Sequence, residues 1–153
     1  MSAKLFIPQE TAVNRETIND AAIYTALTYT IGGRDGDTHS SDGRLDITLS
    51  LPGSYGRGTN PEQLFAAAWS ACFIDAMRYV AREKQITVPV DTRVTAELRL
   101  CHGENGYYLR AHLYVFLPGI CREIAEWLIE EAQETCPYSK ATRGNIGVTI
   151  SLA

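Results

Sequence analysis

A helix start signal followed by a run of small residues constrains this chain more than any other feature. Asn60 is a favourable N-cap, Pro61 suits the first helical position, and Gln63 occupies the capping-box position. The apolar spacing that follows predicts a helix to about Lys84. We expect one apolar stripe along it, formed by Leu64, Ala68, Cys72, Ala76 and either Tyr79 or Val80.

The centre of this predicted helix carries unusually small side chains, namely Ala66, Ala67, Ala68, Ser70 and Ala71. Small side chains let another backbone approach closely. We therefore expect the helix to be buried against a partner. Its polar side is marked by Asp75, Arg78 and Arg82.

Five further segments are predicted strands. Segment 22–31 is rich in Tyr, Thr and Ile; apolar and polar residues alternate in 45–51, 90–100 and 107–117; and 145–152 closes the chain. The first two are expected to pair with each other, and the third and fourth to form a long hairpin. A second amphipathic helix is predicted at 122–135, and Pro137 marks the break after it. Strands joined in hairpins, in the order ββαββαβ, predict an α+β fold.

Composition limits the functional classes. The 153 residues fit a single domain spanning 1–153, or one protomer of a dimer. The net charge of −4 comes from 14 basic and 18 acidic residues without a basic patch, which argues against a nucleic-acid partner. Uncharged runs such as 63–74 are shorter than the roughly 20 residues of a membrane span. The first 20 residues have no apolar core typical of a secretory signal, so we expect a cytoplasmic protein.

The four cysteines lie at positions 72, 101, 121 and 136. Four cysteines permit three disulfide pairings, and a reducing cytosol disfavours structural bridges. Neither a CxxC pair nor a Cys/His cluster at zinc spacing is present, so no metal site is expected. The cysteines are therefore either buried structural thiols or reactive ones.

Each residue that could carry chemistry also has an ordinary structural interpretation. Cys72 lies on an apolar helical stripe, where a core thiol is the commoner occupant. Cys136 stands at a helix end. Arg34 lies in a glycine-rich turn, where an arginine is usually solvated, and Glu62 lies in a first helical turn, where a carboxylate suits the helix dipole. Taken singly, these positions leave the function open.

Three segments taken together are more specific. Residues 60–73 (NPEQLFAAAWSACF) resemble the first cysteine motif of the organic hydroperoxide resistance (Ohr) proteins, a branch of the OsmC-like family. Residues 136–145 (CPYSKATRGN) resemble the second cysteine motif, and residues 32–36 (GGRDG) the arginine segment. The resemblance covers about residues 24–152 in matching order. The segments PEQLF and CPYS favour the Ohr branch over the OsmC branch.

The resemblance implies a fold, an activity and a set of roles. The fold would have antiparallel sheets, long central helices and an intertwined homodimer. Cys72 would attack organic hydroperoxides, including those of fatty acids, and Cys136 would resolve the product. Arg34 and Glu62 would prepare the thiolate. No cofactor is bound in this family, and dihydrolipoamide on lipoylated proteins is the reductant. Ala68-Trp69 departs from the family, which more often has a small residue and tyrosine, while Cys101 and Cys121 lie outside both motifs.

Physical chemistry adds two expectations to these roles. A guanidinium beside Cys72 favours the thiolate, so we expect the pKa of Cys72 below its model value of about 8.5. Glu62 and Cys72 are ten residues apart, or about 15 Å along one helix. Either the helix begins well after Glu62, or Glu62 serves the cysteine of a second chain in a C2 dimer.

Three alternatives remain at this stage. The first is a peroxidase of the OsmC branch with other peroxide and reductant preferences. The second is a redox sensor in which a Cys72–Cys136 disulfide changes a binding surface. The third is a binding module with core thiols. If the protein is a peroxidase, Leu64, Phe65, Phe73 and Met77 are candidates for the walls of an apolar substrate site.

Overall fold

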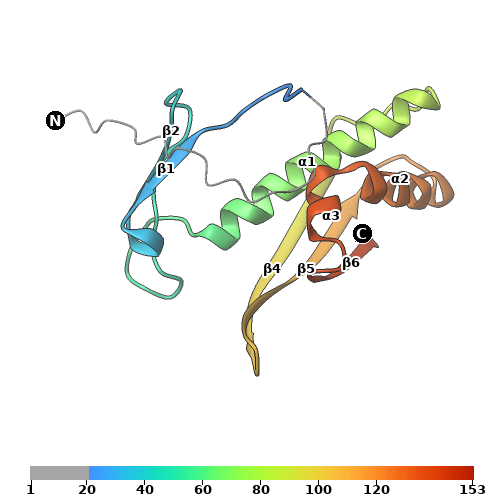
Figure 1. Ribbon diagram of the computed structural model, residues 1–153. Helices are drawn as coiled ribbons and strands as arrows, with labels where there is room; N and C mark the ends of the chain where they lie inside the picture. The colour runs from blue at the N-terminus through green and yellow to red at the C-terminus, as the bar shows by residue number, and fades with distance from the viewer. Residues whose placement is uncertain (1–20) are drawn as a thin grey trace. The chain divides into compact units, whose positions relative to one another are not determined.

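The computed structural model describes residues 21–153 (Figure 1). Contacts within the chain divide it into two units, with the boundary in the sequence between Asn60 and Pro61. The expectation of a single domain spanning 1–153 stays a prediction.

The first unit is built on a three-stranded antiparallel sheet in the order β1-β2-β3. Its strands are β1 (Thr28–Ile31), β2 (Asp37–Ser40) and β3 (Asp46–Thr48), with a short 3-10 helix, η1 (Gly33–Asp35), between the first two. Thr30 and Thr38 pair across β1 and β2 through a 2.8 Å hydrogen bond between their hydroxyls. This sheet fixes the two ends of the turn that carries Arg34.

This unit differs from the expected two-strand arrangement. The predicted direct pairing of 22–31 with 45–51 is wrong, because β2 lies between β1 and β3. The polar sequence of β2, Asp-Thr-His-Ser, gave no strand signal. The predicted first strand is also too long at its start. β2 ends at Ser40, which pairs with Thr28, so the residues before Thr28 have no strand opposite them.

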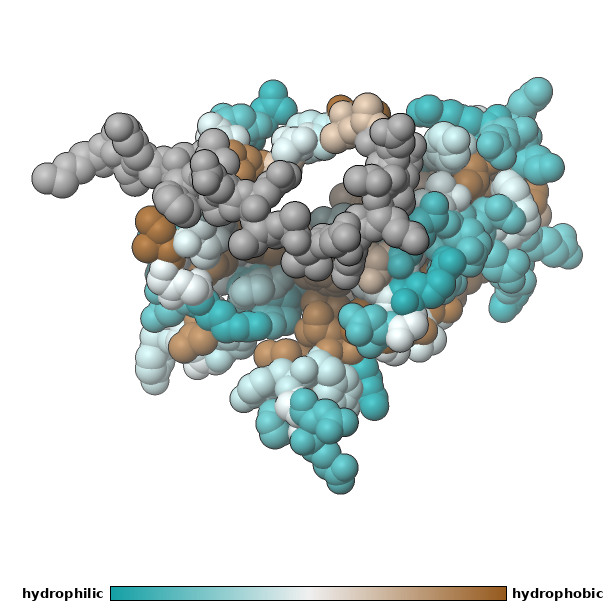
Figure 2. All heavy atoms as spheres, in the orientation of Figure 1, coloured by the Kyte–Doolittle hydropathy of each residue, from teal (hydrophilic) through white to brown (hydrophobic). Residues whose placement is uncertain are grey.

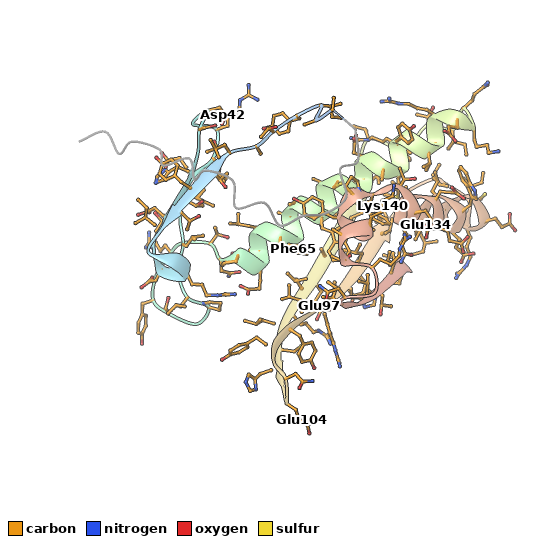
Figure 3. All side chains as sticks on the ribbon, viewed as in Figure 1. Asp42, Phe65, Glu97, Glu104, Glu134 and Lys140 are labelled. Atoms are coloured by element: carbon orange, nitrogen blue, oxygen red, sulfur yellow. The ribbon has the colours of Figure 1, made fainter. Side chains whose placement is uncertain are left out.

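The second unit comprises three helices and a three-stranded sheet in the order β4-β5-β6. Its elements, in chain order, are α1 (Pro61–Glu83), β4 (Arg93–Gly103), β5 (Gly106–Phe116), α2 (Arg122–Thr135), α3 (Pro137–Thr142) and β6 (Gly147–Leu152). Strands β4 and β5 form the expected long hairpin, whose polar tip carries Glu104 (Figures 2 and 3). The α+β class is confirmed.

Two features of this unit were not expected. Strand β6 pairs with β5 in parallel, whereas only antiparallel pairing was predicted. The chain crosses from β5 to β6 through α2 and α3, and a crossover of this length returns the strand in the same direction. The second unexpected feature is α3 itself, which has six residues, too few for a recognisable apolar period.

The core lies between α1, α2 and one face of this sheet. Alternation on β5 buries Ala111, Leu113 and Val115, which point to the helices. On α1 the buried residues are Trp69, Phe73, Ala76, Met77, Val80 and Ala81. This stripe is rotated relative to the predicted one, because the bulky Trp69 and Phe73 occupy the interior. Cys72 lies at its border, partly buried, and Tyr79 is exposed.

Helix α1 is also the one helix of the described residues that is long and apolar enough, by length and composition, to cross a membrane. The core helix of a globular unit has the same properties. Since α1 contributes six buried residues to the core cluster, its packing accounts for its apolar character.

A candidate thiol site on α1 and α3

Cys72 and Cys136 come together although they are 64 positions apart in the chain. The Cys136 thiol donates to the Cys72 sulfur, and the two Sγ atoms are 3.4 Å apart. Cys72 is partly exposed, whereas Cys136 has no exposed surface. A disulfide has an S–S length of about 2.05 Å, so a small movement of either side chain would bring the two sulfurs to bonding distance.

Local sequence explains the position of Cys136. It is the residue between α2 and α3, and its backbone is extended, with φ −61° and ψ 122°. Extended backbone is favoured before a proline, and Pro137 then opens α3. The N–H of Cys136 still donates to the Ala132 carbonyl at 2.8 Å. The proline therefore breaks the helix at Cys136 and turns the chain toward α1.

The surroundings of Cys72 favour its thiol form. Burial raises the pKa of Cys72 above its ordinary value, and the neighbouring Cys136 thiol raises it further. The backbone N–H of Tyr138 lowers this pKa by donating to the sulfur, and the Asp75 carboxylate raises it slightly. The balance of these neighbours is a raised pKa, and the lowering expected from Arg34 stays a prediction. A cation would have to lie beside the Cys72 sulfur to lower this pKa below its ordinary value.

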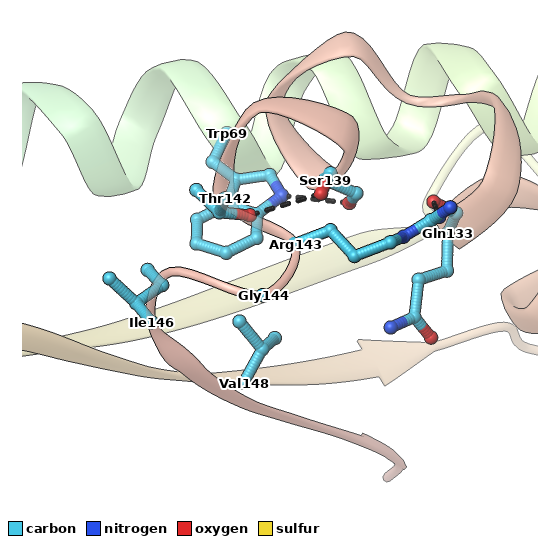
Figure 4. Close-up of a pocket in the computed structure, with 8 residues that line it drawn as sticks. All are labelled: Trp69, Gln133, Ser139, Thr142, Arg143, Gly144, Ile146 and Val148. Atoms are coloured by element: carbon cyan, nitrogen blue, oxygen red, sulfur yellow. Dashed lines mark hydrogen bonds between the residues drawn. The ribbon is translucent and has the colours of Figure 1, made fainter.

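Helix α3 is fastened to α1 beside the two sulfurs. The indole N–H of Trp69 donates to the Ser139 hydroxyl oxygen at 3.1 Å, and both side chains are buried (Figure 4). Phe65, one turn earlier on α1, makes edge-to-face contacts with Trp69 and Tyr138, at ring-centroid distances of 5.7 and 5.8 Å. Sequence reasoning noticed Trp69 only as a departure from the family pattern and did not identify Ser139.

An open pocket of about 200 Å³ lies next to this hydrogen bond. Its walls include Trp69 and Ser139 together with Arg143, Ile146 and Val148 (Figure 4). The Arg143 guanidinium donates to the Glu134 carboxylate and to the Gln133 carbonyl, each at 2.9 Å. This arginine therefore ties the end of α3 to α2, and neither cysteine lines the pocket.

Arg34 lies in a turn that depends on its glycines. Gly32 and Gly33 have φ values of 78° and 65°, in the left-handed region that glycine tolerates best. A Cβ at Gly36 would lie 1.9 Å from the Ile31 carbonyl oxygen. The turn is thus specified by sequence, but it belongs to the first unit and Cys72 belongs to the second.

Glu62 lies in the first turn of α1, which runs without a break from Pro61 to Glu83. The possibility that the helix begins well after Glu62 is therefore excluded. Glu62 and Cys72 remain about 15 Å apart along the axis, so the structure does not bring them together within one chain.

The other candidate positions show no comparable arrangement. Cys101 on β4 is a free thiol, as is the exposed Cys121 at the start of α2. Within residues 21–153, no group of three or more His, Cys, Asp or Glu side chains is placed to hold a metal ion. The Cys72–Cys136 pair is thus the site with the clearest chemistry.

The chain matches a known class of protein. The model of the OsmC-like protein family matches residues 53–151, so the chain belongs to the OsmC-like family.

Its relatives place it within that family. The chain is 41% identical to the organic hydroperoxide resistance protein of Xanthomonas axonopodis pv. citri, over 88% of this chain and 97% of the relative. It is 42% identical to the organic hydroperoxide resistance protein OhrA of Bacillus subtilis, over 86% and 96%. The crystal structure of OhrB of Bacillus subtilis is similar with a TM-score of 0.81 and 40% identity, covering 86% of this chain and 100% of that chain. These similarities place the chain in the Ohr branch.

Proposed function

We propose that this protein is a thiol-dependent peroxidase that reduces organic hydroperoxides and so protects against oxidative stress. The observation that carries the proposal is the 3.4 Å contact between a partly exposed Cys72 and a buried Cys136. The names of the relatives support the hydroperoxide as the substrate class. We expect the protein to act in the cytoplasm, where thiols are kept reduced.

The reaction follows from the accessibility of the two sulfurs. The Cys72 thiolate attacks the terminal peroxide oxygen, which carries the hydrogen, the O–O bond breaks, and the alkoxide takes a proton from solvent and leaves as the alcohol. Cys72 is now a sulfenic acid. The Cys136 sulfur attacks the Cys72 sulfur, and the hydroxyl leaves as water, giving a disulfide. A dithiol reductant then opens this disulfide and is itself oxidised to a cyclic disulfide.

Dihydrolipoamide, carried on lipoylated proteins, is the reductant that we propose. Its first thiol forms a mixed disulfide with the protein. Its second thiol then attacks that mixed disulfide and releases the protein thiolate, so the exchange is completed within one reductant molecule. The reductant has access to Cys72, whose sulfur is partly exposed, whereas Cys136 is enclosed. No bound cofactor is needed for these steps.

Arg34 and Glu62 are proposed to prepare the Cys72 thiolate. The pKa of Cys72 is raised by burial and by Cys136. A neighbouring guanidinium would act in the opposite direction by favouring the thiolate. A carboxylate orients a guanidinium by bidentate hydrogen bonding, which is the role proposed for Glu62. Both groups would also leave the sulfur open to the peroxide.

The site is proposed to form in a homodimer. Helix α1 is continuous and keeps Glu62 away from Cys72 of the same chain. Ala67 and Ala71 lie one turn apart on α1 and are exposed in the protomer. Small exposed residues allow two α1 helices to pack closely and antiparallel, which moves Glu62 of one chain toward Cys72 of the other.

The proposal is tested by peroxide consumption with dihydrolipoamide in excess. Cys72→Ser should abolish consumption. Cys136→Ser should release one equivalent of alcohol and stop as a sulfenic acid. Cys101→Ser and Cys121→Ser are the matched controls and should turn over as the wild type does. Full activity of Cys72→Ser would contradict the proposal, and a wild type that forms the disulfide without catalytic turnover would favour the redox sensor.

A further inference from the structure

Two hydrogen bonds between side chains join α1 to the α3 segment, beside the Phe65–Tyr138 ring contact, and their partners occur in reverse order along the two segments. Trp69 precedes Cys72 by three residues on α1, and Ser139 follows Cys136 by three residues. The first link is the hydrogen bond from the Trp69 indole to the Ser139 hydroxyl, at 3.1 Å. The second is the Cys136–Cys72 contact, at 3.4 Å. The hydrogen bond therefore lies one helical turn from the reacting sulfurs.

This hydrogen bond joins two buried side chains. Trp69 is 1% exposed and Ser139 is 5% exposed. An indole N–H is a donor only, so removal of the Ser139 hydroxyl leaves it without a partner in the protein. A buried donor without an acceptor costs free energy. The hydrogen bond therefore favours α3 packed against α1 over α3 detached from it.

Helix α3 needs such an anchor. It has six residues, and isolated helices of that length are not stable, so its position depends on tertiary contacts. Arg143 fastens its end to α2, not to α1. Oxidation of Cys72 to a sulfenic acid places a hydroxyl on its sulfur. The hydrogen bond from the Cys136 thiol to the Cys72 sulfur is then no longer the one found in the reduced protein. The Trp69–Ser139 bond involves no sulfur, so this oxidation alters neither its donor nor its acceptor.

We propose that Trp69 and Ser139 are positioning residues that hold the Cys136 sulfur against Cys72 while the disulfide forms. The inference rests on the proposed function. The step it concerns is the attack of Cys136 on the Cys72 sulfenic acid, in which an S–S bond forms, the S–O bond breaks and water leaves. The side chains of Trp69 and Ser139 hydrogen-bond to each other and not to either sulfur. They act by keeping α3, and with it Cys136, next to α1.

The test separates the two chemical steps in a single turnover. Trp69→Phe keeps an aromatic ring and removes the donor, and Ser139→Ala removes the acceptor. After mixing with one equivalent of cumene hydroperoxide, rapid quenching and intact-mass analysis give the rates of sulfenic acid and disulfide formation. We expect the first rate to stay at the wild-type value in both variants. Disulfide formation should slow by about tenfold or more, as expected when reacting groups lose their alignment.

The double variant and two matched controls assign the effect. If the hydrogen bond is the cause, Trp69→Phe/Ser139→Ala should be no slower than the slower single variant. Ser70→Ala removes a hydroxyl that donates only to Ala66 of the same helix, and Trp127→Phe alters a tryptophan on α2. Both should form the disulfide at the wild-type rate.

The outcomes distinguish this inference from the proposed function. A wild type that forms no disulfide would refute the proposed function. A wild type that forms it, with Ser139→Ala equally fast, would refute the positioning role. Circular dichroism reports whether each variant folds. If Trp69→Phe does not fold, Ser139→Ala, which removes one oxygen, decides the question alone.

Discussion

Glu62 and Cys72 lie on one uninterrupted helix, ten residues and about 15 Å apart along its axis. That separation is too long for the two side chains to share a hydrogen-bond network within one chain. If both residues serve one thiol site, the site takes its glutamate from one protomer and its cysteine from another. The prediction that follows is one of complementation.

Cys72→Ser and Glu62→Gln should each impair the homodimer. The two variants should restore activity when they are combined in one dimer. In a mixed dimer of Cys72→Ser and Glu62→Gln chains, the remaining Cys72 meets the intact Glu62 of its partner. One complete site then forms. We expect about half the wild-type rate per dimer from this one site of two, because the sites of a C2 dimer are equivalent. Co-expression with two affinity tags isolates the mixed dimer, and peroxide consumption measures the rate.

The control places both substitutions in one chain. A dimer of Cys72→Ser/Glu62→Gln with wild type pairs the remaining Cys72 with the altered glutamate and should be as slow as the Glu62→Gln homodimer. If this control were active and the first mixed dimer were not, Glu62 would serve its own chain and the proposed arrangement would be wrong.

Arg34 should lower the pKa of the Cys72 thiol in the assembled protein. The immediate surroundings raise this pKa through burial and the Cys136 thiol, and a guanidinium acts in the opposite direction by favouring the thiolate. Arg34→Ala should therefore shift the pKa upward. The thiolate fraction at neutral pH falls, so alkylation of Cys72 slows there and recovers at alkaline pH. The pH profile of iodoacetamide labelling, followed by peptide mass analysis, measures this shift.

Arg44→Ala is the matched control for that experiment. Arg44 belongs to the same unit, is largely exposed, and pairs with Asp42 at 3.6 Å. Its removal should leave the labelling profile of Cys72 unchanged. An Arg34→Ala profile identical to that of the wild type would identify Arg34 as a solvated turn residue.

Local signals predicted the parts of the fold that depend on local sequence. The start of α1 at Pro61 followed from Asn60 and Pro61, and the β4–β5 hairpin followed from alternation and a polar turn. Strand β2 was missed because its polar residues form a strand only between β1 and β3. The parallel pairing of β5 with β6 was missed for a similar reason, because a crossover of two helices decides it.

The candidate site was predictable only in part. Spacing alone does not bring together two cysteines that are 64 positions apart, and the expectation came from the resemblance of the two cysteine motifs. The Trp69–Ser139 hydrogen bond spans 70 positions and has no local signal. The direction of the Cys72 pKa depends on burial and on Cys136, which are tertiary properties.

Phe73 should contribute to stability and not to a substrate wall. Phe73 and Met77 were candidates for the walls of an apolar substrate site, but both have no exposed surface and belong to the core cluster. Phe73→Ala should lower the free energy of unfolding by about 3–5 kcal/mol, through lost burial and the cavity left behind. Chemical denaturation monitored by circular dichroism measures the change.

The matched control is a substitution at an exposed position of the same helix. Tyr79 is 58% exposed. Tyr79→Ala should change the free energy of unfolding by about 0.5 kcal/mol or less, as is usual for surface positions. If the dimer forms through α1, the comparison is made at one fixed protein concentration, because unfolding is then coupled to dissociation. Equal losses in the two variants would contradict the assignment of the buried stripe.

Organic hydroperoxides should be reduced with much higher efficiency than hydrogen peroxide. Leu64 and Phe65 precede Cys72 on α1 and remain partly exposed, so apolar surface is available on the helix that carries the reactive sulfur. Burial of a methylene group contributes about 0.8 kcal/mol, or close to fourfold in kcat/KM for each methylene that is enclosed. Hydrogen peroxide has no such surface. In a series of alkyl hydroperoxides of increasing length, with dihydrolipoamide in excess, kcat/KM should rise with each added methylene until the chain extends beyond the site. Fatty-acid and cumene hydroperoxides should lie near the top of the series and hydrogen peroxide at the bottom. A flat series, or a preference for hydrogen peroxide, would contradict the proposed substrate class and favour a peroxidase with the preferences of the OsmC branch.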